Sequence, residues 1–97
     1  MCEVIDILTK LEKKVILAVA ELNENAYGVS VRKKVQEHTG KNLIYGRLYN
    51  ILYKLIRKNF VFKMEGEPLE ERGNRVKIYY CLTQEGEEIL NLLSKPV

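Results

Sequence analysis

Lysine and arginine side chains gather in the middle of the chain, where their number and spacing suit the binding of an anion. Segment 31–63 contains nine basic residues and one acidic residue, Glu37, so its net charge is +8. The two flanking segments together have a net charge of −5, and the whole chain of 97 residues reaches only +3. Positive charge confined to one part of a chain is typical of a surface that binds a polyanion. Solvated helix faces are the alternative, because residues that cluster in sequence need not cluster in space.

Residue types that support catalysis or metal binding are scarce. The chain has one histidine, His38, and two cysteines, Cys2 and Cys81, which are too few for a zinc site with ordinary ligand spacing. It contains no phosphate-binding glycine loop, no zinc-protease histidine pair and no serine elbow. We therefore expect no catalytic activity, no bound metal and no cofactor.

The length and hydropathy of the chain limit its organisation and its environment. A chain of 97 residues with 46% hydrophobic content suffices for one compact domain and not for two. No apolar run approaches the roughly 20 residues that a membrane-spanning helix needs. Charged residues interrupt the aliphatic N-terminal segment, unlike in a signal peptide. We expect a cytoplasmic protein that has no contact with a membrane.

Three segments in the first 58 residues have the spacing of amphipathic helices. Thr9 followed by Glu12 has the pattern of a capping box, so a first helix is predicted to begin there and to end at the polar cluster 23–25. A second helix is predicted over 27–38, with Gly40 as its stop signal. A third is predicted over 45–58. It turns inward Leu48, Ile51, Leu52, Leu55 and Ile56, and outward Gly46, Arg47, Asn50, Lys54 and Arg57.

A β-hairpin and a last helix are predicted after Asn59. In the first strand Phe60, Phe62 and Met64 alternate with Val61 and Lys63, which predicts one apolar face. Segment 65–74 has the composition of a turn, and a second alternating strand is predicted over 76–82. Tyr80 is expected in the core and Tyr79 at partial exposure. Thr83 is predicted to cap the last helix, whose apolar side includes Ile89, Leu90, Leu92 and Leu93.

This order of elements predicts a winged helix-turn-helix, a mainly α fold with a small two-stranded β-hairpin. In such folds the third helix enters the major groove of DNA and the hairpin lies over the phosphate backbone. We expect a single winged-helix domain over 1–97. It is expected to consist of an N-terminal arm at 1–8, a core at 9–82 and a C-terminal dimerisation helix at 83–97.

Three motifs in the chain resemble the PadR-like regulator family. They are the pair Tyr27-Gly28, the run Gly-Arg-Leu-Tyr-Asn-Ile-Leu-Tyr-Lys-Leu at 46–55, and the run from Glu71 to Gly86 that includes Arg-Val-Lys-Ile-Tyr-Tyr-Cys-Leu-Thr. Their order and spacing match the family over nearly the whole chain. The resemblance implies a transcriptional regulator without catalytic activity, acting as a repressor, whose recognition helix begins near Gly46.

One position departs from the family pattern. Where the family often has a serine-led cap before the recognition helix, this chain has Ile44 followed by Tyr45. Isoleucine has no side-chain oxygen and cannot cap a helix. Two alternatives remain open: Asn42 caps the helix two residues earlier, or the first turn frays. In both cases Tyr45 is expected to be an exposed aromatic residue at the end that faces DNA.

Ten residues of the second helix, the segment after it, the recognition helix and the wing are expected to contact double-stranded DNA. They are Arg32, Lys33, Lys41, Tyr45, Arg47, Asn50, Lys54, Arg72, Arg75 and Lys77. Two roles are open for Arg47, since arginine can donate two hydrogen bonds to the edge of guanine or can contact a phosphate. The phosphate role is favoured because most hydrogen bonds between protein and DNA go to the backbone. The same ambiguity applies to Asn50 and Lys54.

A homodimer is expected because the last helix offers more apolar surface than a lone terminal helix readily buries. The family resemblance also implies that the first and last helices pack against their counterparts in a second subunit. The expected interface residues are Ile5, Leu8, Leu11, Ile89, Leu90 and Leu93. A small-molecule effector is left open, because no residue identifies one. The alternative function is a winged-helix adaptor that binds protein and not DNA.

Overall fold

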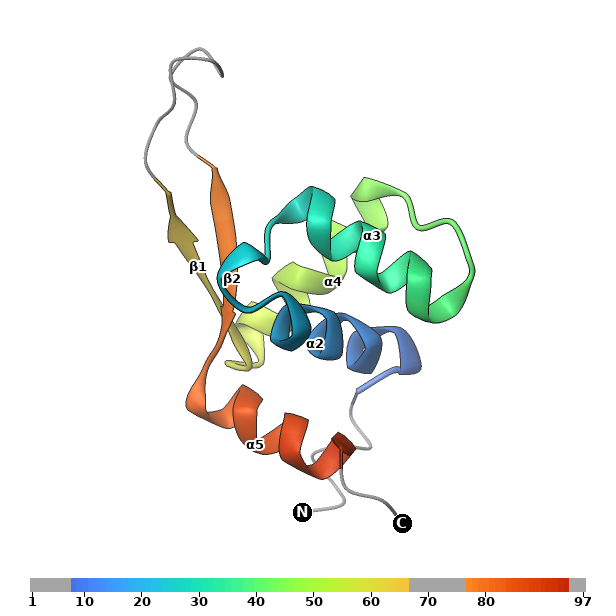
Figure 1. Cartoon of the computed structure of the whole chain (residues 1–97). Helices are drawn as coiled ribbons and strands as arrows, with labels where there is room; N and C mark the ends of the chain where they lie inside the picture. The colour runs from blue at the N-terminus through green and yellow to red at the C-terminus, as the bar shows by residue number, and fades with distance from the viewer. Residues whose placement is uncertain (1–7, 67–76, 95–97) are drawn as a thin grey trace.

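Four α-helices and a two-stranded antiparallel sheet make up residues 8–66 and 77–94, which are the residues that this computed structural model describes. The helices are α2 (Lys10–Leu22), α3 (Gly28–Thr39), α4 (Tyr45–Arg57) and α5 (Gln84–Ser94), with a short 3-10 helix η1 (Asn23–Asn25) after α2. The strands are β1 (Val61–Glu65) and β2 (Ile78–Leu82). In the view of Figure 1, α3 lies above α2, α5 lies below it, and the strands β1 and β2 lie to the left of the helices. The arrangement confirms the predicted winged helix-turn-helix.

The helix boundaries follow from the capping groups that the sequence offers. Thr9 Oγ1 accepts a hydrogen bond from the backbone N–H of Glu12 at 3.1 Å, and the Glu12 carboxylate accepts one from the Thr9 N–H at 2.9 Å. This reciprocal pair confirms the capping box at the start of α2. Gly40 ends α3 with φ 69°, and Asn59 follows α4 with φ 67°. Both residues have the left-handed conformation that commonly ends a helix.

The hydrophobic core lies between the four helices and the base of the hairpin. Helix α4 contributes its predicted inner face, since Leu48, Ile51, Leu52 and Leu55 are buried and Ile56 is half-buried. The other buried apolar residues are Leu8, Val15, Ile16, Ala18, Val19, Ala26, Val31, Val35, Leu43, Phe60, Val61, Tyr80 and Ile89. Since α4 shares this core with α2, α3 and β1, its orientation is fixed by three neighbouring elements.

The register of the hairpin determines which strand face is buried. Val61 is the Cα partner of Leu82, and Lys63 is the partner of Tyr80, so these four residues share one face of the sheet. Val61 and Tyr80 are buried, and Tyr79 on the opposite face is half-buried. The predicted positions of Tyr80 and Tyr79 are therefore confirmed.

The predicted apolar face of the first strand is wrong. Phe62 and Met64 belong to the outer face of β1 and are 43% and 51% exposed. Phe60 is buried, but it precedes the strand: its backbone N–H donates to the carbonyl oxygen of Leu55 at 3.0 Å, as part of the turn that ends α4. Because Phe60 belongs to that turn, its burial does not follow the alternation of the strand, and the buried strand residue is Val61.

The hairpin is attached to the beginning of α3. The backbone N–H of Tyr80 donates to the carbonyl oxygen of Ala26 at 2.8 Å, and Tyr27 forms an isolated antiparallel bridge with Tyr79. The rings of these two tyrosines meet edge to face with centroids 6.0 Å apart. The base of the wing and the start of α3 therefore hold a fixed relative position.

A second junction joins the end of α4, the start of β1 and the start of α5. Thr83 Oγ1 donates to the carbonyl oxygen of Asn59 at 2.6 Å and accepts from the N–H of Gly86 at 3.0 Å, which confirms Thr83 as the cap of α5. The Thr83 N–H donates to the carbonyl oxygen of Phe60 at 3.0 Å, and Asn59 Nδ2 donates to the Glu85 carboxylate at 3.2 Å. Three hydrogen bonds thus connect the residues that follow the recognition helix to the start of the C-terminal helix.

Two residues that were expected at a dimer interface belong instead to the core of this chain. Leu8 and Ile89 are 5% and 3% exposed, so they have almost no free surface to offer a partner in this conformation. Leu11, Leu90 and Leu93 are half-buried and keep some surface. Ile5 lies outside the described residues. None of the helices in 8–66 and 77–94 is both long enough and apolar enough to cross a membrane.

Candidate nucleic-acid interface

The outward face of α4 bears the side chains that the sequence predicts for it. Arg47, Asn50, Lys54 and Arg57 are exposed, while the opposite side of the helix packs into the core. The thirteen residues of α4 include three cations and no carboxylate. A helix of this kind presents positive charge and hydrogen-bond donors along one surface, which suits a DNA groove.

A row of tyrosines along α4 was not among the predicted site residues, apart from Tyr45. Tyr45, Tyr49 and Tyr53 are 39%, 46% and 58% exposed. The rings of Tyr45 and Tyr49 stack with centroids 6.2 Å apart and an angle of 22° between their planes. The signal was present in the sequence, because a spacing of four residues puts side chains on one side of a helix. Their hydroxyl groups and ring faces add hydrogen bonding and stacking to the face.

Arg32, one of the residues expected to contact DNA, makes several contacts within the chain. Its Nε donates to the carbonyl oxygen of Leu43 at 2.5 Å, and its Nη2 donates to Asn42 Oδ1 at 3.1 Å. Its guanidinium carbon also lies 4.7 Å from the centroid of the Tyr45 ring. Arg32 therefore joins α3 to the turn before α4 and contacts the ring of Tyr45, while its contact with DNA stays a prediction.

Helix α4 begins without a side-chain cap. Ile44 is the N-cap residue and makes no capping hydrogen bond. Asn42 is not an earlier cap, because its Oδ1 accepts hydrogen bonds from Arg32 and from Gln36 Nε2, the latter at 2.9 Å. The first turn nevertheless remains helical from Tyr45 onward. Its backbone N–H groups thus have no side-chain oxygen from the cap residue, and they carry the positive end of the helix dipole.

A cleft of about 440 Å³ separates α4 from the base of the wing. It is lined by the start of α3, by Tyr49 and by the wing residues Lys77, Ile78 and Tyr80. Lys77 is one of the wing residues expected to contact DNA. Its ammonium group lies 3.6 Å from the centroid of the Tyr27 ring and makes a cation–π contact with it. Arg72 and Arg75, the other predicted wing residues, lie outside the described residues.

The start of α3 lies close to the side chain of Tyr49 at Gly28. A Cβ atom on Gly28 would overlap the hydroxyl oxygen of Tyr49. The overlap is with the end of a flexible side chain, so a larger residue at Gly28 would displace the Tyr49 ring from the start of α3. The pair Tyr27-Gly28 therefore lies next to Tyr49, one of the exposed tyrosines of the candidate interface.

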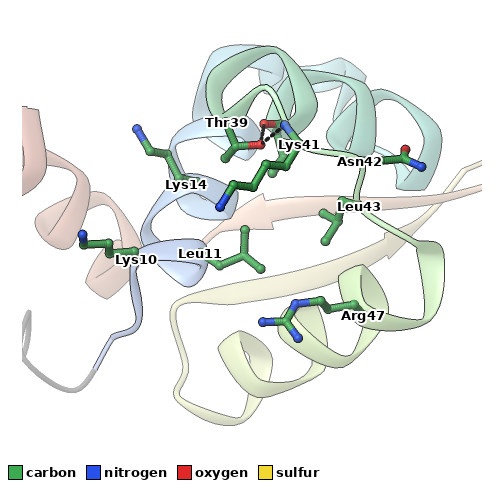
Figure 2. A pocket seen from close by; sticks show the side chains of 9 residues that line it. Lys10, Leu11, Lys14, Thr39, Lys41, Asn42, Leu43 and Arg47 are labelled. Carbon is green, nitrogen blue, oxygen red and sulfur yellow. Dashed lines mark hydrogen bonds between the residues drawn. The ribbon is translucent and has the colours of Figure 1, made fainter.

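The two remaining predicted residues lie on α3 and in the turn that follows it. Lys33 is exposed on α3, and Lys41 is exposed in the turn between α3 and α4. Lys41 and Arg47 line the same groove, and Figure 2 shows Leu11 and Leu43 between them. The recognition helix is thus flanked by an aromatic cleft on one side and by a cationic groove on the other.

A buried ion pair fixes the C-terminal end of α4 against α2. Lys58 Nζ lies 2.8 Å from the Glu12 carboxylate, whose side chain is only 4% exposed. Burial raises the pKa of Glu12, but hydrogen bonds from Lys58 and Thr9 and the positive charge of Lys58 outweigh burial, so the pKa lies below its ordinary value of 4.5. Glu12 thus combines the capping box of α2 with a contact to the recognition helix, which the sequence did not reveal.

The described residues contain no group of three or more histidine, cysteine, aspartate or glutamate side chains able to hold a metal ion. Their candidate site consists of cations, amides and tyrosines displayed on one helix between a wing and a helix pair. That combination defines the class of winged helix-turn-helix DNA-binding proteins.

The comparisons with known proteins agree with this class. The sequence profile described as "Transcriptional regulator PadR-like family" matches residues 16–92. The chain belongs to the PadR-like family of transcriptional regulators. No curated protein matches it.

Several solved structures are similar to the chain over most of its length. RosR from H. salinarum is 29% identical, with 89% of this chain and 71% of that chain covered and a TM-score of 0.67. A PadR-like transcription factor from Bacteroides fragilis is 25% identical, with coverages of 86% and 75% and a TM-score of 0.67. A PadR family transcription regulator from Clostridium difficile R20291 is 26% identical, with coverages of 84% and 81% and a TM-score of 0.63.

Proposed function

We propose that the chain is a sequence-specific double-stranded DNA-binding repressor that acts as a homodimer and has no catalytic activity. The observation that carries the proposal is the outward face of α4, where Arg47, Asn50 and Lys54 are exposed and no carboxylate interrupts them. Cations near the start of a recognition helix neutralise phosphates as the helix enters the major groove. Membership of a transcriptional regulator family supports the same function.

The proposed homodimer rests on the apolar side of the C-terminal helix. Leu90 and Leu93 on α5, and Leu11 on α2, are half-buried within one chain. A second chain would cover this remaining surface, and a two-fold dimer would present its two recognition helices about one DNA turn apart, roughly 34–36 Å. Because Leu8 and Ile89 are already buried, the proposed interface uses the other three residues and not those two.

Selection of bound duplexes from a random pool tests the proposal directly. We expect a near-palindromic operator occupied by two chains. Affinity for that operator is expected to fall roughly 10³-fold between 50 and 200 mM salt if the dimer makes about six phosphate contacts. Fluorescence anisotropy of the labelled duplex measures both affinity and stoichiometry. Absent or salt-independent binding would reject DNA binding and favour the protein-binding adaptor.

Replacing Arg47 with alanine is expected to weaken binding to operator and to random duplex by the same factor, since we assign its side chain to a phosphate. The salt slope is expected to decrease by about one per chain. The matched control is Lys13→Ala, which removes one charge from α2 outside the proposed interface. A loss of about 1–3 kcal/mol confined to the operator would instead assign Arg47 to a base edge.

A further inference from the structure

One edge of the hairpin has no strand beside it. The sheet has two strands in the order β1-β2. The far edge of β2 is joined to the start of α3 by the bridge between Tyr79 and Tyr27. Among the residues that the structure describes, no strand pairs with the far edge of β1. A free strand edge is a surface on which another strand can pair.

The hydrogen bonds of the hairpin identify the backbone groups at this free edge. The Gly66 N–H donates to the carbonyl oxygen of Lys77 at 2.7 Å, and the Phe60 carbonyl oxygen accepts from the Thr83 N–H at 3.0 Å. Hydrogen-bonded and non-hydrogen-bonded pairs alternate along an antiparallel sheet, so the even-numbered residues of β1 direct their backbone groups toward β2. The backbone groups directed toward the free edge are those of Val61, Lys63 and Glu65.

The side chains next to this edge are exposed on both faces of the strand. Phe62 and Met64 are exposed on the outer face, and Lys63 and Glu65 are exposed on the other face. A lysine on an edge strand usually opposes pairing between identical chains, because it brings like charges together. Here Glu65 follows Lys63 on the same face, so one register can bring lysine opposite glutamate instead.

Two copies of β1 are self-complementary when they pair antiparallel about Met64. Lys63 of each copy then lies opposite Glu65 of the other, so two opposite-charge pairs form. Met64 faces Met64 of the second copy as a non-hydrogen-bonded pair, the kind in which side chains are closest. Tyr79 lies beside Met64 on β2, so sulfur and aromatic groups form one row across the outer face. Pairing about Lys63 would place two lysines opposite each other and is disfavoured.

We infer that the free edge of β1 binds the same edge of a second copy of this chain, joining two hairpins into one four-stranded antiparallel sheet. The contact is two-fold symmetric, because the same surface is used by both copies. It is separate from the proposed dimer face of Leu90 and Leu93 on α5. Each edge is a strand of only five residues, so the association is expected to be weak and to depend on protein concentration.

Charge reversal tests the register. Lys63→Glu would place carboxylates opposite each other in both pairs, and Glu65→Lys would place ammonium groups there. Each variant is expected to associate with itself through this edge about tenfold more weakly than the unaltered chain, because two attractions become two repulsions. A mixture of the two variants is expected to regain the association, since opposite charges meet again between unlike chains. Sedimentation velocity of the full chain without DNA, over a range of concentrations, measures each affinity.

Two further proteins control this experiment. The double variant Lys63→Glu/Glu65→Lys exchanges the two charges and is expected to associate as the unaltered chain does. Lys13→Glu reverses a charge on α2, outside the sheet, and is also expected to leave the association unchanged. Circular dichroism shows that each variant is folded.

A disulfide trap locates the contact on the strand. In a chain with Cys2→Ser and Cys81→Ser, Met64→Cys would bring two Cα atoms to about 4.5 Å across the symmetry axis, within the range for a disulfide. Phe62→Cys is the matched variant on the same face, but its two Cα atoms would lie roughly 14 Å apart along the paired strands. Mild oxidation is expected to link chains of the first variant and not of the second, as mass spectrometry of the linked peptides measures.

Three results would overturn the inference. They are the absence of an association step that responds to charge reversal, failure of the mixed variants to regain association, and equally efficient linkage by Phe62→Cys and Met64→Cys. Association through Leu90 and Leu93 would not respond to the charges of β1, so the two self-contacts are distinguishable. Since these measurements contain no DNA, they stand even if the proposed regulator function fails.

On DNA the contact would link neighbouring dimers, and this consequence rests on the proposed function. A dimer formed through α5 has two β1 edges, one in each chain. A series of duplexes with two operators at different spacings is expected to include one that the unaltered chain fills cooperatively and Lys63→Glu fills independently. Equal cooperativity of both proteins at every spacing would reject the link between dimers.

Discussion

Replacement of Gly86 with alanine is expected to lower the free energy of unfolding by about 3 kcal/mol. A Cβ atom at this position would overlap the backbone carbonyl oxygen of Phe60, which also accepts a hydrogen bond from the N–H of Thr83. Because the obstacle is backbone, rotation of a side chain cannot relieve it. The start of α5 must move away from β1, with loss of hydrogen bonds at the junction. Urea unfolding followed by circular dichroism measures the loss.

Gly46→Ala is the matched control for this prediction. No atom lies within 4 Å of a Cβ on Gly46, and the residue is in the first turn of α4. Alanine has the higher helix propensity, so this variant is expected to gain about 0.5 kcal/mol. Equal stabilities for Gly86→Ala and the unaltered chain would show that the close approach to Phe60 does not require glycine.

Replacement of Lys58 with methionine is expected to destabilise the protein by about 3 kcal/mol at neutral pH. The Glu12 carboxylate, nearly inaccessible to water, would keep its negative charge and its hydrogen bond from Thr9 but lose the ammonium 2.8 Å away. Its pKa would then rise, because burial would no longer be outweighed. Urea unfolding measures the loss of stability, and NMR titration of the Glu12 carboxyl carbon measures the pKa.

The pH dependence gives this prediction a definite sign. In the unaltered chain the folded pKa of Glu12 lies below its ordinary value of 4.5, so the stabilising contribution is complete above that pH. It is lost as the pH falls through the folded pKa. In Lys58→Met protonation removes an unfavourable buried charge, so the difference between the two proteins is expected to shrink as the pH falls through the raised pKa of the variant and then through the lower pKa of the unaltered chain. Lys54→Met, which removes an exposed charge one turn earlier, is the control. A difference that does not change with pH would exclude Glu12 as its cause.

Local sequence signals were sufficient to predict most of the helical part of the fold. The capping box at Thr9 and Glu12, the left-handed Gly40 and the apolar stripe of α4 each depend on neighbours within a turn or two, so the sequence contains the whole signal. The face of β1 could not be predicted in the same way. Its burial depends on a register with β2 across the hairpin and on Phe60, which belongs to the turn after α4.

In the candidate site, too, the features that depend on local sequence were predicted, and those that depend on contacts between distant residues were not. The exposure of Arg47, Asn50 and Lys54 follows from helical periodicity and was predicted. The engagement of Arg32 with the Leu43 carbonyl oxygen depends on the path of a turn eleven residues away, which periodicity does not describe. The Glu12–Lys58 pair joins residues 46 positions apart, so it becomes visible only when α2 and α4 are placed together.

Hydrogen bonds connect Asn59 and Phe60, at the end of the recognition helix, to Thr83 and Glu85, at the start of the C-terminal helix. The positions of the two helices are therefore coupled. A partner that rotates α5 would act on the end of α4 and on the base of the wing through these hydrogen bonds. Small angular changes far from DNA would become displacements at the DNA-contacting end. The angle at which two C-terminal helices meet would therefore set the operator spacing that a dimer accepts.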